Sequence, residues 1–174
     1  AKVIYREDEP AIVDEEQPVL KDLRDVYDMP IPDPASSGRL NEWLEATRTL
    51  SEAIGDHVFI MGRADQGPFS IACLLRGTTQ FMMDLLTEDK QLIDDVLEYC
   101  RKISAVFAKA QKDAGAHVTS IGDAFAGPNL ISPDMYRQFA LIPEQKLAKE
   151  VQDYGIPFSI HICGNTNGII QDMG

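Results

Sequence analysis

Apolar and polar positions alternate along the chain in two different periods, which predict helices and strands in turn. Across residues 40–54 the apolar side chains return at spacings of three and four, the pattern of one buried helix face. Three short apolar runs, at residues 57–62, 116–122 and 156–162, are typical of strands buried in a parallel sheet. A polar turn at residues 63–68 follows the first of these runs.

Start and stop signals place further helices between and after the strands. A helix is predicted to open at Pro68 and to cover residues 69–75. Thr87 is predicted as the N-cap of a long helix that Gly115 ends, and Ser132 as the N-cap of a helix that reaches residue 154. We expect Pro143 to kink that helix. Another helix is predicted to begin at residues 169–173.

The order of these elements predicts an α/β fold. Residues 2–6 and 9–14 suggest a β-hairpin, and the proline-rich residues 28–38 suggest a linker. We therefore expect a hairpin insertion and linker over residues 1–38, and strand–helix units with a parallel sheet over residues 39–174. Such a sheet is either open or closed into a barrel. A (β/α)₈ TIM barrel takes about 250 residues, so this chain would be a partial barrel, cut from a longer protein; the family resemblance given below implies this second form. Two open sheet edges favour a homodimer or association with missing barrel segments.

Composition narrows the classes of partner. The 28 acidic and 16 basic side chains give a net charge of −12, which disfavours nucleic acid and anionic membranes. No apolar run reaches membrane-spanning length and no signal peptide is evident, so a cytoplasmic protein is expected. Three widely spaced cysteines do not form a secreted disulfide pattern.

Candidate chemistry gathers where the predicted strands end, because parallel α/β folds bind ligands at the carboxyl ends of their strands. His161 and Cys163 are two apart, so on a strand both point to one face, and an imidazole with a thiolate suits zinc. A buried histidine beside a small buried cysteine is the alternative. Asp123 follows the second strand as a candidate catalytic residue that orients His161 or contacts substrate; a solvated or helix-capping carboxylate is its alternative.

Other polar residues at these strand ends are candidate binding groups. Arg63 and Asp65 could hold a substrate carboxylate or a corrinoid side chain, or could simply pair with each other. Asn165 follows the predicted metal pair and is a further candidate for cofactor binding. His57 and His117 open strands at the opposite end and are interpreted as structural.

Four segments carry a family resemblance. The run Gly-Ile-Pro-Phe-Ser-Ile-His-Ile-Cys-Gly-Asn-Thr from residue 155 resembles the metal segment of zinc methyltransferases in the uroporphyrinogen decarboxylase superfamily, which include the methylcobamide:coenzyme M methyltransferases. Three further segments are similar to that family in the same order: Gly-Pro-Phe-Ser-Ile-Ala from residue 67, Phe-Met-Met-Asp-Leu-Leu from residue 81, and Ile-Gly-Asp-Ala-Phe-Ala from residue 121, followed by Leu-Ile-Ser-Pro-Asp-Met-Tyr from residue 130. The resemblance runs from about residue 40 to 174.

The resemblance implies a function and its cofactors. It implies a zinc-dependent methyltransferase that moves a methyl group from a methylated corrinoid, free or carried by a corrinoid protein, to a small thiol. It also implies a third zinc ligand, a cysteine beyond this chain, so that the fragment alone is expected to be inactive. Cys73 and Cys100 lie on helical stripes and are poor substitutes. The alternatives are uroporphyrinogen decarboxylation in tetrapyrrole biosynthesis, or a non-catalytic module that binds a tetrapyrrole or a partner.

Overall fold

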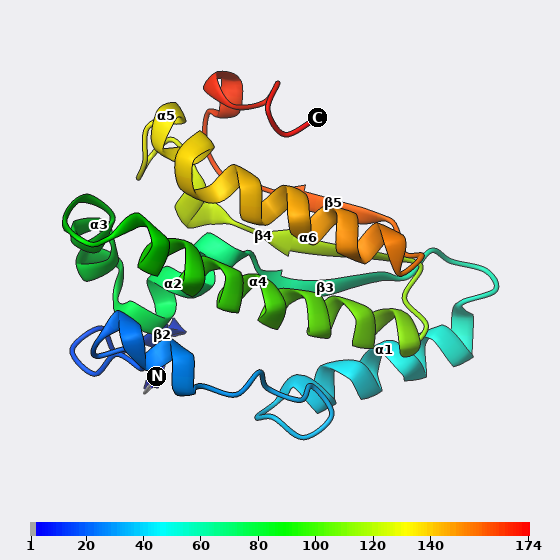
Figure 1. Cartoon of the computed structure of the whole chain (residues 1–174). Coiled ribbons are helices and arrows are strands. Elements are labelled where there is room, and N and C mark those ends of the chain that lie inside the picture. Colours follow the sequence, from blue (N-terminus) through cyan, green and yellow to red (C-terminus); the bar gives the residue numbers. More distant parts are fainter. Residues whose placement is uncertain (1–2) are drawn as a thin grey trace.

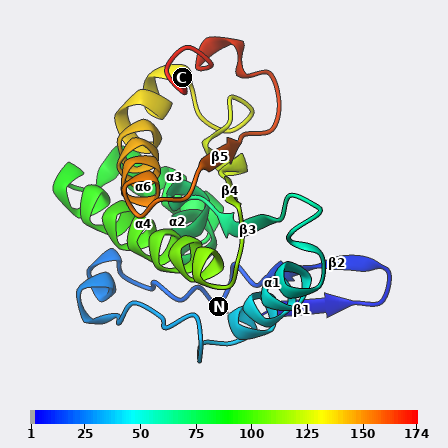
Figure 2. The same ribbon diagram turned by 90° about the vertical axis from the view of Figure 1, so that its right-hand side faces the viewer.

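The computed structural model, which describes residues 3–174, contains a parallel sheet of three strands in the order β3-β4-β5. The strands are β3 (Met61–Gln66), β4 (Val118–Gly122) and β5 (Phe158–His161). The helices α4 (Lys90–Asp113) and α6 (Leu141–Asp153) connect them and pack together on one face of the sheet (Figures 1 and 2). This arrangement confirms the predicted parallel α/β layout.

The strand β3 begins four residues later than predicted. Instead of residues 57–62, it covers Met61–Gln66, and the apolar side chains of Val58 and Phe59 are exposed. The residues that β3 turns toward α4, Gly62 and Ala64, are small, and both are buried. A Cβ at position 62 would come within 3.0 Å of Gln111 and Ala116, so close packing against α4 selects the strand position.

Helix boundaries agree with the sequence in most places. The helix α1 spans Leu40–Ile54 as predicted, and α2 (Pro68–Arg76) has Pro68 at its first position. The predicted N-cap at Thr87 is wrong because Thr87 ends a further helix, α3 (Thr78–Thr87). Asp89 caps α4 instead, its carboxylate accepting the Gln91 N–H at 2.8 Å.

The stretch before β5 departs from regular α-helix. Ser132 caps the short α5 (Pro133–Met135), whose last residues run into a π-helical turn at Tyr136–Ala140 and then into α6. The Leu141 N–H donates to the Tyr136 carbonyl, five residues back. The expected distortion near Pro143 therefore takes the form of a widened turn just before it. The helix predicted at residues 169–173 is wrong: these residues form turns after a 3-10 helix at Thr166–Gly168.

The N-terminal part packs against the helices. The predicted hairpin is confirmed as β1 (Val3–Arg6) paired with β2 (Glu9–Val13), although residue 2, which the prediction included, lies outside the described residues. After it, Leu20, Leu23 and Val26 join the core of α2 and α4. No helix within residues 3–174 is long and apolar enough to cross a membrane.

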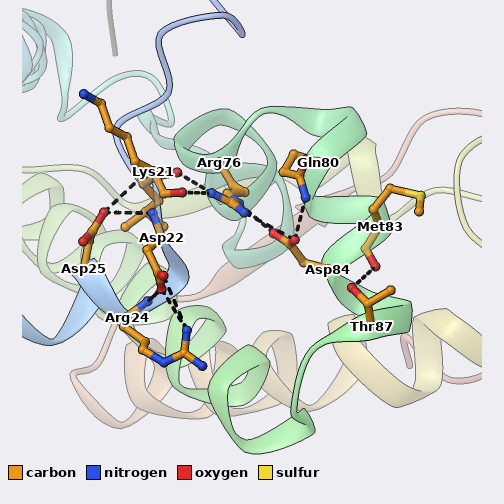
Figure 3. Close-up of polar contacts among 10 residues, drawn as sticks. Lys21, Asp22, Arg24, Asp25, Arg76, Gln80, Met83, Asp84 and Thr87 are labelled. Atoms are coloured by element: carbon orange, nitrogen blue, oxygen red, sulfur yellow. Dashed lines mark hydrogen bonds and ion pairs between the residues drawn. The ribbon is translucent and has the colours of Figure 1, made fainter.

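Arg76, at the end of α2, joins this N-terminal segment to α3. Its guanidinium donates to Asp84 on α3 (Nε to Oδ2, 2.7 Å) and to the carbonyls of Leu20 and Lys21 (Figure 3). Arg24 pairs with Asp22 on the surface nearby. The Arg76–Asp84 pair is nearly buried, with 14% and 3% of the two side chains exposed. The pair therefore ties three segments together away from bulk water.

Candidate metal site at the end of the sheet

One face of the sheet carries the polar side chains that the sequence singles out. Because side chains alternate along a strand, Gly62 and Ala64 face α4 while Met61 and Arg63 face the other way and are exposed. On β5 the exposed positions are Ser159 and His161. We call this side, defined by Met61, Arg63, Ser159 and His161, the open face.

His161 and Cys163 meet at the carboxyl end of β5. The imidazole Nε2 lies 3.2 Å from the Cys163 Sγ, and both residues are exposed. The predicted metal pair and its structural alternative both stay predictions. A histidine nitrogen and a cysteine sulfur bound to one tetrahedral zinc lie roughly 3.6 Å apart. The two atoms are thus placed closely enough to share an ion.

Neighbouring loops hold the chain around Cys163. A Cβ at Gly127 would lie 2.9 Å from the Cys163 carbonyl oxygen, so the loop after β4 packs directly on the metal-pair loop. Gly164 has a φ of +93°, which turns the chain away immediately after Cys163. The Asn165 side chain accepts the Asn167 N–H at 3.2 Å and so caps the following 3-10 helix. Asn165 as a cofactor-binding residue stays a prediction.

Asp123 is fully buried and serves as an anchor between elements. Its carboxylate accepts the N–H groups of Phe69 and Ser70 at the start of α2, and the Ser70 hydroxyl at 2.6 Å. Its own N–H donates to the His161 carbonyl at 2.9 Å. This is the helix-capping alternative, applied to α2, and it joins α2 to β5 through one residue. A catalytic role for Asp123 stays a prediction.

A second buried acid, Glu144, lies next to Asp123. Glu144 on α6 accepts a hydrogen bond from the Tyr136 hydroxyl at 2.5 Å, and its Oε1 has no hydrogen-bond partner among residues 3–174. Burial, reinforced by the negative charge of Asp123, raises the pKa of Glu144 to about 9. Burial also raises the pKa of Asp123 to about 6, although its bonds from Ser70 and Phe69 oppose the rise.

Arg63 and Asp65 pair with each other across the bulge in β3. Arg63 Nε lies 3.3 Å from Asp65 Oδ1, and the side chains are 47% and 59% exposed. Asp65 is a non-glycine residue with a φ of +62°, at the point where the register with β4 shifts. The structure thus contains the mutual pair that the sequence offers as one of two alternatives; substrate binding stays a prediction.

Two cysteines are kept away from the site. Cys73 and Cys100 are fully buried in helices, and burial raises the pKa of both thiols, which disfavours the thiolate form that binds metal. Among residues 3–174, no group of three or more histidine, cysteine, aspartate or glutamate side chains is placed to hold a metal ion. His161 and Cys163 as zinc ligands stay a prediction.

Sequence reasoning missed three residues around the site. Ser70, Tyr136 and Glu144 contact Asp123 or each other from distant parts of the chain, and no local spacing signals such contacts. One sequence feature could have pointed to close contacts at this end of the sheet. A glycine within a strand, here Gly122, often marks the close approach of another group, although this signal is weak.

A parallel sheet whose strands alternate with helices, with polar side chains at the carboxyl ends of its strands, is typical of α/β proteins that bind ligands at that end. The uroporphyrinogen decarboxylase (URO-D) family matches residues 1–174, and the chain belongs to that family.

Relatives within the family include both methyltransferases and decarboxylases. The chain is 33% identical to the methylcobamide:CoM methyltransferase MtaA of Methanosarcina barkeri over 135 residues. This match covers 78% of this chain and 38% of that protein. It is 30% identical to a uroporphyrinogen decarboxylase of Streptomyces avermitilis, over 75% of this chain and 37% of that one. A solved methyltransferase from Methanosarcina mazei superposes with a TM-score of 0.79 at 35% identity, over 88% of this chain and 43% of the other. The chain therefore spans about two fifths of the relatives' length.

Proposed function

We propose that the protein is a zinc-dependent methyltransferase that moves a methyl group from a methylated corrinoid to a thiol acceptor. The observation that carries the proposal is the His161 Nε2–Cys163 Sγ distance of 3.2 Å on the open face, at the carboxyl end of β5. Similarity to methylcobamide:CoM methyltransferases supports the same reaction class.

The two side chains fit zinc in chemistry and in setting. Imidazole and thiolate are both common zinc ligands, and a catalytic site leaves a position open for a substrate. Zinc, when bound, favours the thiolate form of a coordinated thiol at neutral pH.

The remaining residues position this pair. The Asp123 N–H bond to the His161 carbonyl fixes the end of β5, and the Gly127 loop supports the Cys163 backbone. In the transfer, the acceptor sulfur would release its proton to solvent and bond to the methyl carbon while the carbon–cobalt bond of the methyl donor breaks. The electron pair of that bond stays with the corrinoid, so no external oxidant or reductant is needed.

Zinc analysis tests the proposal on the purified protein together with the barrel segments expected beyond this chain, because the third zinc ligand is expected there. We expect about one zinc per chain after zinc exposure, lost in Cys163→Ala, because removing the sulfur leaves one ligand of the pair. Ser159→Ala, on the same strand and face, is the matched control and should keep the metal. A wild-type protein that stays free of zinc after exposure, or a Cys163→Ala variant that binds it equally well, contradicts the proposal.

Uroporphyrinogen decarboxylation is the second candidate, supported by the decarboxylases among the relatives. The two reactions separate at one residue. A metal-free decarboxylase should lose little activity in Cys163→Ala, whereas methyl transfer to a thiol should be abolished.

A further inference from the structure

The loop that contains Cys163 is fixed at its start and leaves the core after it. His161 ends β5, and its carbonyl accepts the Asp123 N–H at 2.9 Å. Residues 163–168 are then mostly exposed, and the chain returns to the core at Ile169, which is 1% exposed. The position of the Cys163 sulfur therefore depends on the contacts that hold the far end of this loop.

Arg137 holds that far end with two of the three polar contacts that it makes within residues 3–174. Its Nη2 donates to the Gly168 carbonyl at 3.0 Å, and its Nε donates to the Asp172 carboxylate at 3.0 Å. The third contact, from Nη1 to Asp134 at 3.0 Å, joins Arg137 to α5, three residues back. An arginine can make all three contacts at once because its guanidinium carries its N–H donors in a planar fork. The segment after β5 is thereby held beside α5 (Figure 1).

The π-helical turn at Tyr136–Ala140 places Arg137 for these contacts. Tyr136 is fully buried, whereas Arg137, the next residue, reaches outward to Gly168. Widened turns of this kind are rare and occur frequently at functional sites. The irregular turn thus coincides with the point where this helical segment contacts the loop that contains Cys163.

The contacts of Arg137 are too exposed to add much to global stability. The Arg137 side chain is 44% exposed, and those of its partners Asp134 and Asp172 are 96% and 27% exposed. Exposed ion pairs contribute little to the free energy of unfolding. Groups that orient the ligands of a metal, by contrast, change metal affinity by about 10- to 100-fold. The main effect expected of Arg137 is therefore on the order of the loop.

We infer that Arg137 is a positioning residue for the metal pair. By binding the Gly168 carbonyl and the Asp172 carboxylate, it holds the loop that presents the Cys163 sulfur. The inference rests on the proposed function, in which His161 and Cys163 bind zinc. It adds a residue that acts on the site through the backbone and not through contact with the metal.

Zinc affinities of matched variants test the inference, measured by competition with a chelator on the protein that includes the barrel segments expected beyond this chain. We expect Arg137→Gln to weaken zinc binding about tenfold or more, because the far end of the loop is released. Asp172→Asn removes the partner on the loop side and should also weaken binding. Asp134→Asn removes the partner on the α5 side of the same guanidinium, so it is the control and should stay within about twofold of the wild type.

Two further readouts separate positioning from a general loss of structure. Cobalt(II) bound in place of zinc absorbs light through its bond to a thiolate, and Arg137→Gln should shift or weaken this absorption band because the Cys163 sulfur is displaced. The urea midpoint of unfolding should stay close to that of the wild type, because the lost contacts are exposed. The inference is overturned by a zinc affinity of Arg137→Gln within about twofold of the wild type, by an equal loss in Asp134→Asn, or by a loss that only follows a fall in the unfolding midpoint.

Hydrogen exchange in the metal-free protein separates this inference from the proposed function. The Ile169 and Ile170 N–H groups both donate to the Thr166 carbonyl, at the far end of the loop. We expect them to exchange about fivefold faster in Arg137→Gln than in Asp134→Asn, because a hydrogen bond that closes this turn is lost. If the wild type binds no zinc while this difference persists, the methyl-transfer proposal fails and Arg137 still positions the loop. Equal exchange in the two variants refutes the positioning role whether or not zinc binds.

Discussion

At the residue scale, Glu144 is a carboxyl group whose charge the fold disfavours. Only 5% of the residue is exposed, and Asp123 places a second acidic group against it. With its pKa raised to about 9, Glu144 retains its proton in the folded chain at pH values where the unfolded chain releases it. The free energy of unfolding therefore falls as the pH rises, because the unfolded chain releases the Glu144 proton more readily.

We expect the stability contribution of Glu144 to be complete below the unfolded pKa of about 4.3 and to be lost as the pH rises toward about 9. The slope reaches at most about 1.4 kcal/mol per pH unit. Glu144→Gln should remove this dependence and be more stable than the wild type at pH 8. Urea unfolding at pH 5 and pH 8 measures the difference.

Glu150, on the same helix, provides the opposite control. Burial opposes the change, but ion pairs with Lys109 and Arg101 lower the pKa of Glu150, so its charged form is stabilising above the unfolded pKa. Glu150→Gln should therefore lose stability at pH 8. A Glu144→Gln variant that also loses stability at pH 8 would contradict the prediction that Glu144 is buried in its neutral form.

The sequence predicts single residues well where their spacing is local. His161 and Cys163 could be placed together because positions two apart on a strand share a face. The α2 partners of Asp123 lie more than fifty residues away in the chain, and Glu144 lies on another helix, so neither its cap of α2 nor its contact with Glu144 could be read from spacing.

At the element scale, the boundaries that can be predicted are those set by local patterns and not by contacts with distant residues. The helix α1 can be placed to the residue because its apolar positions repeat every three to four residues before Gly55. The strand β3 is misplaced because its buried positions are Gly62 and Ala64, which carry little hydrophobic signal, whereas the stronger apolar run before it is exposed. Packing against α4, which no local pattern records, decides that position.

A further prediction concerns the way Arg76 joins neighbouring elements. We expect Arg76→Ala to lower the free energy of unfolding by about 3–5 kcal/mol, because Asp84 would remain buried without its partner. Arg24→Ala, which breaks an exposed pair in the same region, should cost less than about 1 kcal/mol. Denaturant unfolding compares them, and equal losses would refute the structural role of the buried pair.

At the scale of the whole molecule, the strands β3 and β5 flank β4 and each pairs with one neighbour within the described sheet. Unpaired strand edges with exposed backbone groups promote association. We expect the purified chain to form a dimer or larger species in solution, and light scattering coupled to size exclusion measures its mass. A monodisperse monomer across a range of concentrations would contradict the expectation. The parallel strand–helix order of this sheet is predictable from the alternation of apolar runs. Closure into a barrel would need more strands than the three in this chain.

The exposed sulfur of Cys163 also has a consequence for handling the protein. An accessible thiol can be oxidised by air to a sulfenic acid or to an intermolecular disulfide, whereas the buried Cys73 and Cys100 are shielded. A covalent dimer through Cys163 would have the same mass as a dimer formed through strand edges, and it would block the proposed zinc ligand at the same time. Mass measurements with and without reductant separate the two, and metal-loaded protein should resist the oxidation because its sulfur is already bonded.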